Sequence, residues 1–292
     1  MSHDKVLITG ASGRLGEFVL DEFCSRGAVS VLDLEPPHRA DVAHVTGDVT
    51  DLDTVRSAVQ GHDAVVHLAA IDLGVPATPE RYFGVNVMGT WNVLQAAREA
   101  GIHKVILASS ISANGVGEMR EDFAPRYLPV DEAHPCEPVH PYGISKLVVE
   151  EVARGFARTG MSVICMRPTA VAVPSHLPKM IPRTLDPDHR WLASYVTGAD
   201  TARAFRLALD YEAAFDVFFL SAADSAASEP TLQRAERLFG HVPEIRDPQR
   251  FVREPRASMI DSSRARERLG WEPTSNWPDL AAGVGGGTGA AP

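Results

Sequence analysis

Tyr142 and Lys146 stand four residues apart in the segment 142–159, whose apolar spacing predicts a helix, so both side chains face the same side of it. A free tyrosine has a pKa of about 10 and is a weak base at neutral pH. An ammonium group about 4 Å away contributes about 4 kcal/mol at an effective dielectric constant of 20. That interaction lowers a phenol pKa by up to ~3 units before burial opposes it. We therefore expect Tyr142 to remove a proton from a hydroxyl group, although the same spacing also arises where two helical residues only pack.

Two serines supply the next reactive group. Ser109 and Ser110 follow an apolar run, 104–108, that predicts a buried strand. A hydroxyl at the end of such a strand can orient the oxygen of a substrate. A serine in this place is also commonly a loop residue or a helix cap, so the neighbouring motifs must decide.

Three glycines indicate where a phosphate would bind. Gly10, Gly13 and Gly16 lie between an apolar run, 6–9, and a segment that predicts a helix over 17–26. In a strand–turn–helix unit, the first glycine permits the turn, the second admits a pyrophosphate, and the third allows close packing of the helix. The helix N-terminus adds unpaired N–H groups and a partial positive charge. The pattern therefore predicts a dinucleotide site.

Asp33 indicates which dinucleotide this is. It ends a second apolar run, 29–32, and lies seventeen residues beyond Gly16. An acidic residue at about this spacing accepts hydrogen bonds from the adenosine ribose and repels a 2′-phosphate, which favours NAD over NADP. Arg14 could meet a 2′-phosphate and argues the other way, whereas Glu35 adds negative charge.

Composition bounds the remaining possibilities. The 292 residues are 45% hydrophobic and 23% charged, with a formal net charge of −10, as in a globular protein without a basic nucleic-acid surface. Cys24, Cys136 and Cys165 are widely spaced, so we expect neither disulfides nor a metal site. The chain has no signal segment and no apolar run long enough to span a membrane, and we expect a cytoplasmic protein.

Apolar runs alternate with helical patterns, which predicts an α/β fold, a Rossmann-type doubly wound parallel sheet with a small C-terminal substrate-binding region. Further strands are expected over 64–68, 162–166 and 217–220, and further helices over 87–100 and 200–209. Long connections over 71–81, 113–141 and 171–195 follow strand ends, where open sheets bind ligands. We divide the chain into a dinucleotide-binding core, 1–168, a mixed substrate-binding region with returning core elements, 169–282, and a disordered tail, 283–292.

The ordered set of motifs resembles the extended short-chain dehydrogenases/reductases of the NAD-dependent epimerase/dehydratase family. The matching motifs cover most of the chain and are the glycine turn, Asp33, Gly47-Asp48-Val49-Thr50-Asp51, His67-Leu68-Ala69-Ala70, Asn86-Val87-Met88-Gly89-Thr90, Ala108-Ser109-Ser110, Tyr142-Gly143-Ile144-Ser145-Lys146, Arg167-Pro168-Thr169 and Leu269-Gly270-Trp271-Glu272-Pro273.

The resemblance implies roles for individual residues. Ser110, Tyr142 and Lys146 match the catalytic positions of the family, and no metal is implied. The cofactor, NAD rather than NADP, would contact Gly10, Gly13, Arg14, Leu15, Gly16, Asp33, Asp48, Val49, Leu68, Ala69, Ala70, Asn86, Ala108, Ser109, Tyr142, Lys146, Pro168 and Thr169. Among these, Asp48 would hold the adenine amino group, and Pro168 and Thr169 would lie near the nicotinamide.

The chain departs from the family pattern in two places. Asn114-Gly115 stands where Tyr-Gly is common, which puts substrate contacts in doubt. Fewer than thirty residues separate Arg167-Pro168 from Tyr195-Val196, which leaves little material to enclose a nucleoside diphosphate. In this respect the chain is similar to the small uronate dehydrogenases of the family.

Three functions are consistent with these residues. The first is hydride transfer between NAD and a hydroxyl or carbonyl of a small sugar or sugar acid, a reaction of carbohydrate metabolism. Candidate carboxylate-binding residues for it are Arg81, Arg126, Lys179 and Arg183. The alternative is a nucleotide-sugar 4-epimerase (UDP-glucose type) or dehydratase with tightly bound NAD. A cofactor-binding sensor or scaffold is the third, and the intact catalytic set disfavours it. The family further implies a homodimer, with no nucleic-acid or membrane partner.

Overall fold

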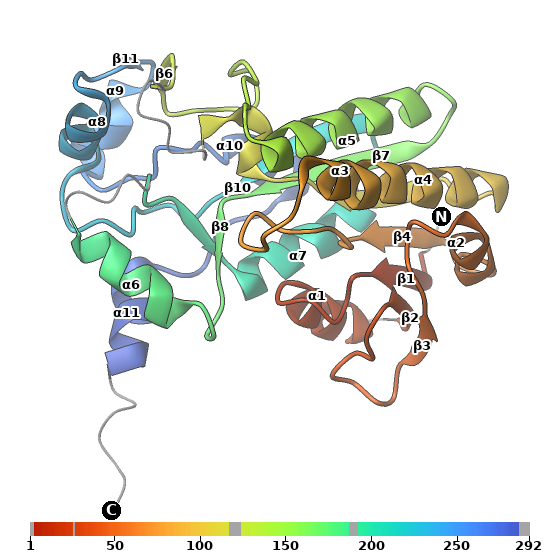
Figure 1. Ribbon diagram of the computed structural model, residues 1–292. Coiled ribbons are helices and arrows are strands. Elements are labelled where there is room, and N and C mark those ends of the chain that lie inside the picture. The colour runs from red at the N-terminus through yellow and green to blue at the C-terminus, as the bar shows by residue number, and fades with distance from the viewer. Residues whose placement is uncertain (1–2, 26, 117–123, 187–191, 286–292) are drawn as a thin grey trace, which may run out of the picture.

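The computed structural model describes residues 3–25, 27–116, 124–186 and 192–285 (Figure 1). Its centre is a sheet of seven parallel strands in the order β10-β7-β5-β4-β1-β2-β3. The strands are β1 Lys5–Thr9, β2 Ala28–Asp33, β3 Ala43–Thr46, β4 Ala64–His67, β5 Lys104–Ala108, β7 Ser162–Pro168 and β10 Phe215–Leu220. The order reverses between β1 and β4, and a ligand crevice is expected at the carboxyl ends of the strands there.

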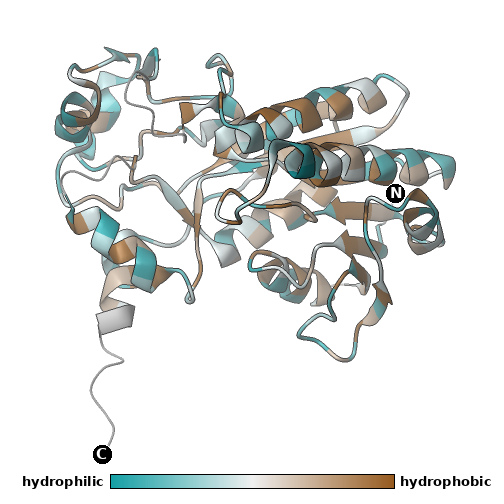
Figure 2. Cartoon of the chain, viewed as in Figure 1, coloured by the Kyte–Doolittle hydropathy of each residue, from teal (hydrophilic) through white to brown (hydrophobic). Residues whose placement is uncertain are grey.

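Helices cover both faces of the sheet, as the alternation along β1 requires. Ile8 pairs with Val31 of β2 and Val66 of β4 and packs with helices α1 Gly16–Cys24 and α7 Gly198–Leu209 on one face. Leu7 points to the opposite face, which is covered by α2 Leu52–Ala58, α4 Gly89–Glu99 and α5 Pro141–Ala157. The strands of the sheet are largely brown in Figure 2, because they are buried from both sides.

Smaller elements surround the carboxyl end of the sheet. They are α3 Pro79–Tyr82, the π-helix η1 Phe83–Met88, the 3₁₀ helix η2 Ile111–Asn114, the paired strands β6 Tyr127–Leu128 and β11 Glu244–Ile245, the paired strands β8 Ala170–Ala172 and β9 Tyr195–Thr197, and the helices α6 Leu177–Leu185, α8 Thr231–Phe239, α9 Pro248–Arg253, α10 Ser263–Leu269 and α11 Trp277–Gly285. In Figure 1, α6 and α11 lie beside each other, away from the main helical layers.

The doubly wound fold predicted from the sequence is confirmed, and every strand and helix expected there is present, most with shifted ends and the strand over 104–108 with the expected ones. The first helix, for example, ends at Cys24 rather than at position 26, which lies outside the described residues. Helix α11 continues to Gly285, into the segment 283–292 that the composition predicts to be disordered, and the rest of that segment is not described. Within the described ranges, none of the helices combines the length and apolar character that crossing a membrane requires.

Candidate functional site

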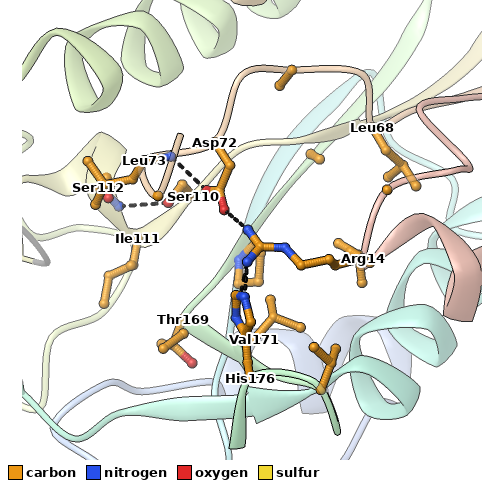
Figure 3. Close-up of a pocket in the computed structure, with 18 of the residues that line it drawn as sticks. Arg14, Leu68, Asp72, Leu73, Ser110, Ile111, Ser112, Thr169, Val171 and His176 are labelled. Carbon is orange, nitrogen blue, oxygen red and sulfur yellow. Dashed lines mark hydrogen bonds and ion pairs between the residues drawn. The ribbon is translucent and has the colours of Figure 1, made fainter. Parts of the chain in front are cut away.

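A cavity of about 810 Å³ opens at the carboxyl ends of β1, β4, β5 and β7, with the start of α5 and helix α6 along its walls (Figure 3). It brings together fourteen of the residues selected from the sequence. These are Gly10, Gly13, Arg14, Leu15, Gly16, Leu68, Ala70, Ala108, Ser109, Ser110, Tyr142, Lys146, Pro168 and Thr169. The predicted crevice at the strand ends is therefore present.

The glycine turn has the shape that a pyrophosphate needs. Gly10 has a φ of +76°, and a Cβ on it would collide with the backbone of Ala69. A Cβ on Gly13 would meet only the carbonyl oxygen of Gly10, at 3.4 Å, and Gly13 itself lines the cavity, so backbone can approach a ligand there. Gly16 is required because a Cβ would strike Gly10 and Ala11. It therefore tightens the turn itself rather than the contact between helix and sheet. The turn fits the phosphates of a dinucleotide.

Asp33 lies beside this turn at the end of β2. Its carboxylate accepts hydrogen bonds from the amides of Ser12, at 2.9 Å, and Leu34, at 2.7 Å. These two amides fix the carboxylate next to the glycine turn, where an adenosine ribose would reach it. Asp33 is not part of the wall of the 810 Å³ cavity.

Four further candidates also lie outside the cavity wall: Asp48, Val49, Ala69 and Asn86. Asp48 is exposed and accepts the amide of Thr50 at 2.8 Å, whereas Val49 is buried in the core. The amide of Asn86 bonds the backbone of Ile71 in both directions and the hydroxyl of Ser145. In this structure Asn86 ties the loop after β4 to α5 rather than facing the cavity.

The three catalytic candidates meet at the inner end of the cavity, and all are buried. Tyr142 lines the cavity together with Ser110 and Asp72. Ser110 also caps η2 by accepting the amide of Ser112 at 3.1 Å. The ammonium of Lys146 donates to the carbonyl of Ala108 at 2.8 Å and lies 5.9 Å from the centre of the Tyr142 ring.

The expected lowering of the Tyr142 pKa is wrong for this arrangement. Burial, followed by the charge of Asp72, raises the pKa of Tyr142 well above its usual value, and the effect of Ser110 offsets this only in part. Burial also lowers the pKa of Lys146 to about 8, which Asp72 opposes. The sequence could not reveal that desolvation exceeds the effect of the lysine.

Asp72 is a charged residue of the cavity wall that the sequence analysis did not select. It follows β4 in the loop that begins at position 71, and its carboxylate forms an ion pair with Arg14 at 2.5 Å. Arg14 also contacts His176, so three segments meet across the cavity (Figure 3). A single acidic residue in a loop after a strand carries no pattern, and only its place in the fold marks it.

Ser109 plays a different part from Ser110. Its hydroxyl donates to Glu150 at 2.6 Å, and Glu150 binds Arg167 through two hydrogen bonds of 2.7 and 2.6 Å. Glu150 and Arg167 are almost fully buried. Ser109 therefore joins the segment after β5 to α5, and the buried pair joins α5 to β7.

The outer end of the cavity is cationic. Lys179 and Arg183 of α6 line it together with His176, whereas Asp72 is the one carboxylate among its lining residues in the described part of the chain. The other two arginines expected to bind a carboxylate do not line it. Arg126 pairs with Glu137, and Arg81 is exposed on α3. The described residues contain no group of three or more His, Cys, Asp or Glu side chains arranged to hold a metal ion.

Comparisons with known proteins agree with this geometry. Residues 6–228 match the model of the NAD dependent epimerase/dehydratase family. A UDP-glucose 4-epimerase of Streptomyces lividans is 28% identical and aligns over 92% of both chains. A short-chain dehydrogenase/reductase superfamily protein of Agrobacterium tumefaciens, solved with bound NAD, superposes with a TM-score of 0.73 at 25% identity, covering 96% of this chain and 95% of that one.

A uronate dehydrogenase of Agrobacterium tumefaciens has the same fold. Its TM-score is 0.66 at 21% identity, over 100% of this chain and 92% of the other. The family model spans most of the sequence, includes the glycine turn and all three catalytic candidates, and names the cofactor that this turn fits. The chain therefore belongs to the NAD dependent epimerase/dehydratase family, as its motifs predict.

Proposed function

We propose that the protein is an NAD-dependent oxidoreductase that transfers a hydride between the cofactor and a hydroxyl or carbonyl group of a small sugar acid or sugar. The observation that carries this proposal is that Ser110, Tyr142 and Lys146 share one cavity with the glycine turn. A base, a group that orients the substrate oxygen and a cradle for the cofactor then lie within reach of one bound molecule.

The side chains divide the work at the substrate oxygen. Tyr142, in its ionised form, accepts the proton of the substrate hydroxyl, and Ser110, which lines the same cavity, holds the same oxygen. Bound NAD supplies the carbon that takes up the hydride. Lys146, fixed by Ala108, holds the nearby ribose and favours the ionised phenol. Because the pKa of Tyr142 is raised, oxidation should become faster as the solution becomes more alkaline.

The cofactor residues follow from the same placement. Gly10, Gly13 and Leu15 would present backbone to the pyrophosphate, and Asp33 would bind the adenosine ribose. Asp48 and Val49 would border the adenine beyond the cavity. Ala70, Pro168 and Thr169 line the cavity and would contact the remainder of the molecule.

The charge of the outer cavity favours an acidic substrate. Two cationic side chains, Lys179 and Arg183, line the cavity against one acidic side chain, Asp72, although the net charge of the protein is −10. A carboxylate held by an arginine and a lysine gains about 1.5–3 kcal/mol per charged hydrogen bond. The uronate dehydrogenase that shares this fold acts on a sugar acid according to its name, which fits this choice.

One alternative has a specific observation in its favour. The relative aligned over 92% of both chains is a UDP-glucose 4-epimerase, which by its name interconverts the 4-hydroxyl configuration of a nucleotide sugar. The same catalytic residues could serve that reaction. The cationic wall of Lys179 and Arg183 would then hold the diphosphate.

We also propose that the protein forms a homodimer through α4 and α5. Trp91 is 44% exposed and meets Phe156 edge-on at 5.2 Å between ring centres, in a groove shared with Val148 and Val152. An exposed tryptophan in an apolar groove is typical of an interface. Sedimentation of Trp91→Glu as a monomer, with the unaltered protein a dimer, supports the proposal, and a monomeric unaltered protein contradicts it.

Purified protein should be incubated with NAD⁺ and a panel of uronates and aldoses, with NADH measured by absorbance. We expect NADH with a sugar acid and a loss of about 10²–10⁴-fold in kcat for Tyr142→Phe. Conversion of UDP-glucose to UDP-galactose without net NADH would favour the epimerase. Full activity of a folded Tyr142→Phe enzyme would refute both.

The binding wall has its own test. Lys179→Ala and Arg183→Ala should each raise KM for the acidic substrate by about 10–100-fold with little change in kcat, since each loses a charged hydrogen bond. Arg81→Ala is the matched control, because Arg81 lies outside the cavity wall and should leave KM unchanged.

A further inference from the structure

A line of buried polar side chains runs from the strand that precedes the glycine turn to the helix that carries Tyr142. Its members belong in turn to β1, β4, α4, η1 and α5, so elements that are distant in the sequence meet along it. Each member is at most 3% exposed, and they are Thr9, His67, Thr90, Asn86 and Ser145. Buried polar groups need hydrogen-bond partners, and here the bonds pass from one element to the next.

His67 is the centre of the first half of this line. Its Nδ1 lies 2.6 Å from the hydroxyl oxygen of Thr9, and its Nε2 lies 3.0 Å from that of Thr90. The hydroxyl of Thr90 donates its only hydrogen to the carbonyl of Asn86 at 2.6 Å, so Nε2 of His67 must donate to Thr90. Nδ1 is then the acceptor, and Thr9 donates to it. The hydrogen bonds therefore hold the ring as the tautomer with its hydrogen on Nε2.

The side chain of Asn86 continues the line to the catalytic helix. It donates to the hydroxyl of Ser145 at 3.0 Å, and Ser145 donates to the carbonyl of Tyr142 at 2.7 Å. The same side chain exchanges two hydrogen bonds with the backbone of Ile71, at 2.8 and 3.2 Å. The donors along the line thus all point the same way, from the end of β1 to the first turn of α5.

The other end of the line lies against the glycine turn. Thr9 is directly followed by Gly10, and its hydroxyl also accepts the amide of Ala69 at 3.4 Å. A Cβ on Gly10 would collide with the backbone of Ala69, so the turn and the segment after β4 are packed without a gap. A shift at Thr9 would therefore move the turn that fits the pyrophosphate.

We propose that His67 is a positioning residue, which through Thr9 and Thr90 holds the cofactor-binding turn and the helix of Tyr142 in one fixed relation. The proposal rests on the function proposed above, because it assigns to His67 the relative placement of cofactor and base in that reaction. Hydride transfer needs its reacting atoms about 3–3.5 Å apart, and a displacement of about 1 Å costs about 100-fold in rate. A buried ring bonded at both nitrogens restrains the two ends of the line against such a displacement.

The charge of His67 is fixed as firmly as its tautomer. Burial, followed by the positive charge of Lys146, lowers the pKa of His67 to about 3. A second ring hydrogen would also face the hydroxyl of Thr9, which already donates to that nitrogen. The ring therefore stays neutral near physiological pH and keeps the same donor and the same acceptor.

The test breaks the line on each side of His67 without removing the ring. Thr9→Val and Thr90→Val keep the shape of the side chain and lose the hydroxyl, whereas Thr9→Ser and Thr90→Ser keep the hydroxyl. Thr231→Val is the matched control, because Thr231 is fully buried in α8 and its hydroxyl donates to the carbonyl of Ala257 at 2.6 Å. Thr231 does not line the cavity. Urea denaturation measures how far each variant is destabilised.

The first readout is the reduction of NAD⁺ by the uronate that reacts in the panel above, with hydrogen or deuterium on its carbons. At saturating NAD⁺, kcat should fall by about 10–100-fold in Thr9→Val and Thr90→Val, and the deuterium isotope effect should rise, because hydride transfer itself is slowed. The double variant should be no slower than the slower single variant, since either substitution breaks the same line. The serine variants and Thr231→Val should keep the rate and the isotope effect.

The second readout needs no substrate, and it decides the question where no uronate reacts. Fluorotyrosine is placed at position 142 of the full-length protein, which is then saturated with NAD⁺. We expect one narrow fluorine resonance in the otherwise unaltered protein and in Thr231→Val, and a broadened or divided resonance in Thr9→Val and Thr90→Val. The nitrogen resonances of His67 should show the hydrogen on Nε2 near neutral pH.

A narrow, unchanged fluorine resonance in folded Thr9→Val and Thr90→Val would overturn the proposal, as would a His67 ring with its hydrogen on Nδ1. The same rate loss in Thr231→Val as in Thr90→Val would also overturn it, because the effect would then follow stability alone. Activity retained by Tyr142→Phe would instead count against the proposed function and would leave the fluorine result unaffected.

Discussion

Two arginine–carboxylate pairs flank the reactive residues, and they differ in every physical respect. Glu150 and Arg167 lie outside the cavity wall with side chains 2% and 5% exposed, and two hydrogen bonds join them. Arg14 and Asp72 lie inside the cavity, about half exposed, and join through a single nitrogen of the guanidinium. The first pair is bonded to Ser109, and the second pair lines the cavity together with Tyr142.

The difference in burial separates an ion pair that stabilises the core from an ion pair that lies in the site. A buried pair must stay together because either partner alone would be an unsolvated charge in the core. Burial opposes the charge on Arg167, yet the Glu150 carboxylate raises its pKa, so the guanidinium remains charged. The half-exposed pair is screened by water and contributes little to folding. It can therefore be separated at little cost, whereas the buried pair cannot.

The largest effect should follow from breaking the buried pair. Glu150→Gln leaves the Arg167 guanidinium without its counter-charge in the core, and we expect a loss of about 3–5 kcal/mol in the free energy of unfolding. Urea denaturation followed by circular dichroism measures it. Glu151→Gln is the matched control on the same helix, because Glu151 is 60% exposed and its ion-pair partner among the described residues is Arg154. If Glu150→Gln lowered the free energy of unfolding by less than about 1 kcal/mol, the two pairs would not differ in how much they stabilise the fold.

The carboxylate of Glu132 differs from those of Glu150 and Asp72, because it is mostly buried and is held mainly by a backbone amide. Glu132 accepts the amide of Phe219 at 2.7 Å, and burial raises its pKa to about 7. With a folded pKa above the unfolded value of 4.5, the folded state binds the extra proton between these limits. The contribution of Glu132 to the free energy of unfolding should therefore be highest below pH 4.5. It should fall as the pH rises to about 7.

Glu132→Gln should remove that fall, because the amide oxygen still accepts the Phe219 bond but carries no charge. The variant should be more stable than the unaltered protein above pH 7, by up to about 3 kcal/mol, and equally stable at pH 4.5. Thermal unfolding across this range gives the answer, with Glu151→Gln as the reference. If the stability of the unaltered protein and that of Glu132→Gln changed with pH in parallel, Glu132 would not titrate as described.

The three carboxylates also show what the sequence could and could not predict. Gly10, Asp33 and the pair Tyr142 and Lys146 were identifiable because their spacing is fixed by one turn, one strand end or one helix. The sheet was predictable for a similar reason, since strands buried on both faces are continuous apolar runs. The short strands β8 and β9 and helix α6, by contrast, carry no such periodicity in a segment rich in proline and charge.

Contacts between segments that are distant in the sequence could not be predicted from it. Nothing in the sequence places Asp72 against Arg14 in the cavity that Tyr142 lines, because the contact depends on how the loop after β4 folds over the sheet edge. The same holds for Asn86, whose motif suggests a cofactor contact but whose amide secures that loop. The sign of the Tyr142 pKa shift was missed because burial is a property of the packed molecule rather than of helical spacing.

The smallest effect on stability should come from the pair in the cavity. Arg14→Gln should change the free energy of unfolding by less than about 1 kcal/mol, because water screens both partners. The same variant should bind NAD⁺ more weakly in calorimetry, since Arg14 lines the cavity beside the glycine turn. Arg39→Gln is the control, because Arg39 pairs with Asp41 on the surface and should change neither quantity. If Arg14→Gln proved as destabilising as Glu150→Gln, the pair in the cavity would be part of the scaffold, and the contrast between the two pairs would fail.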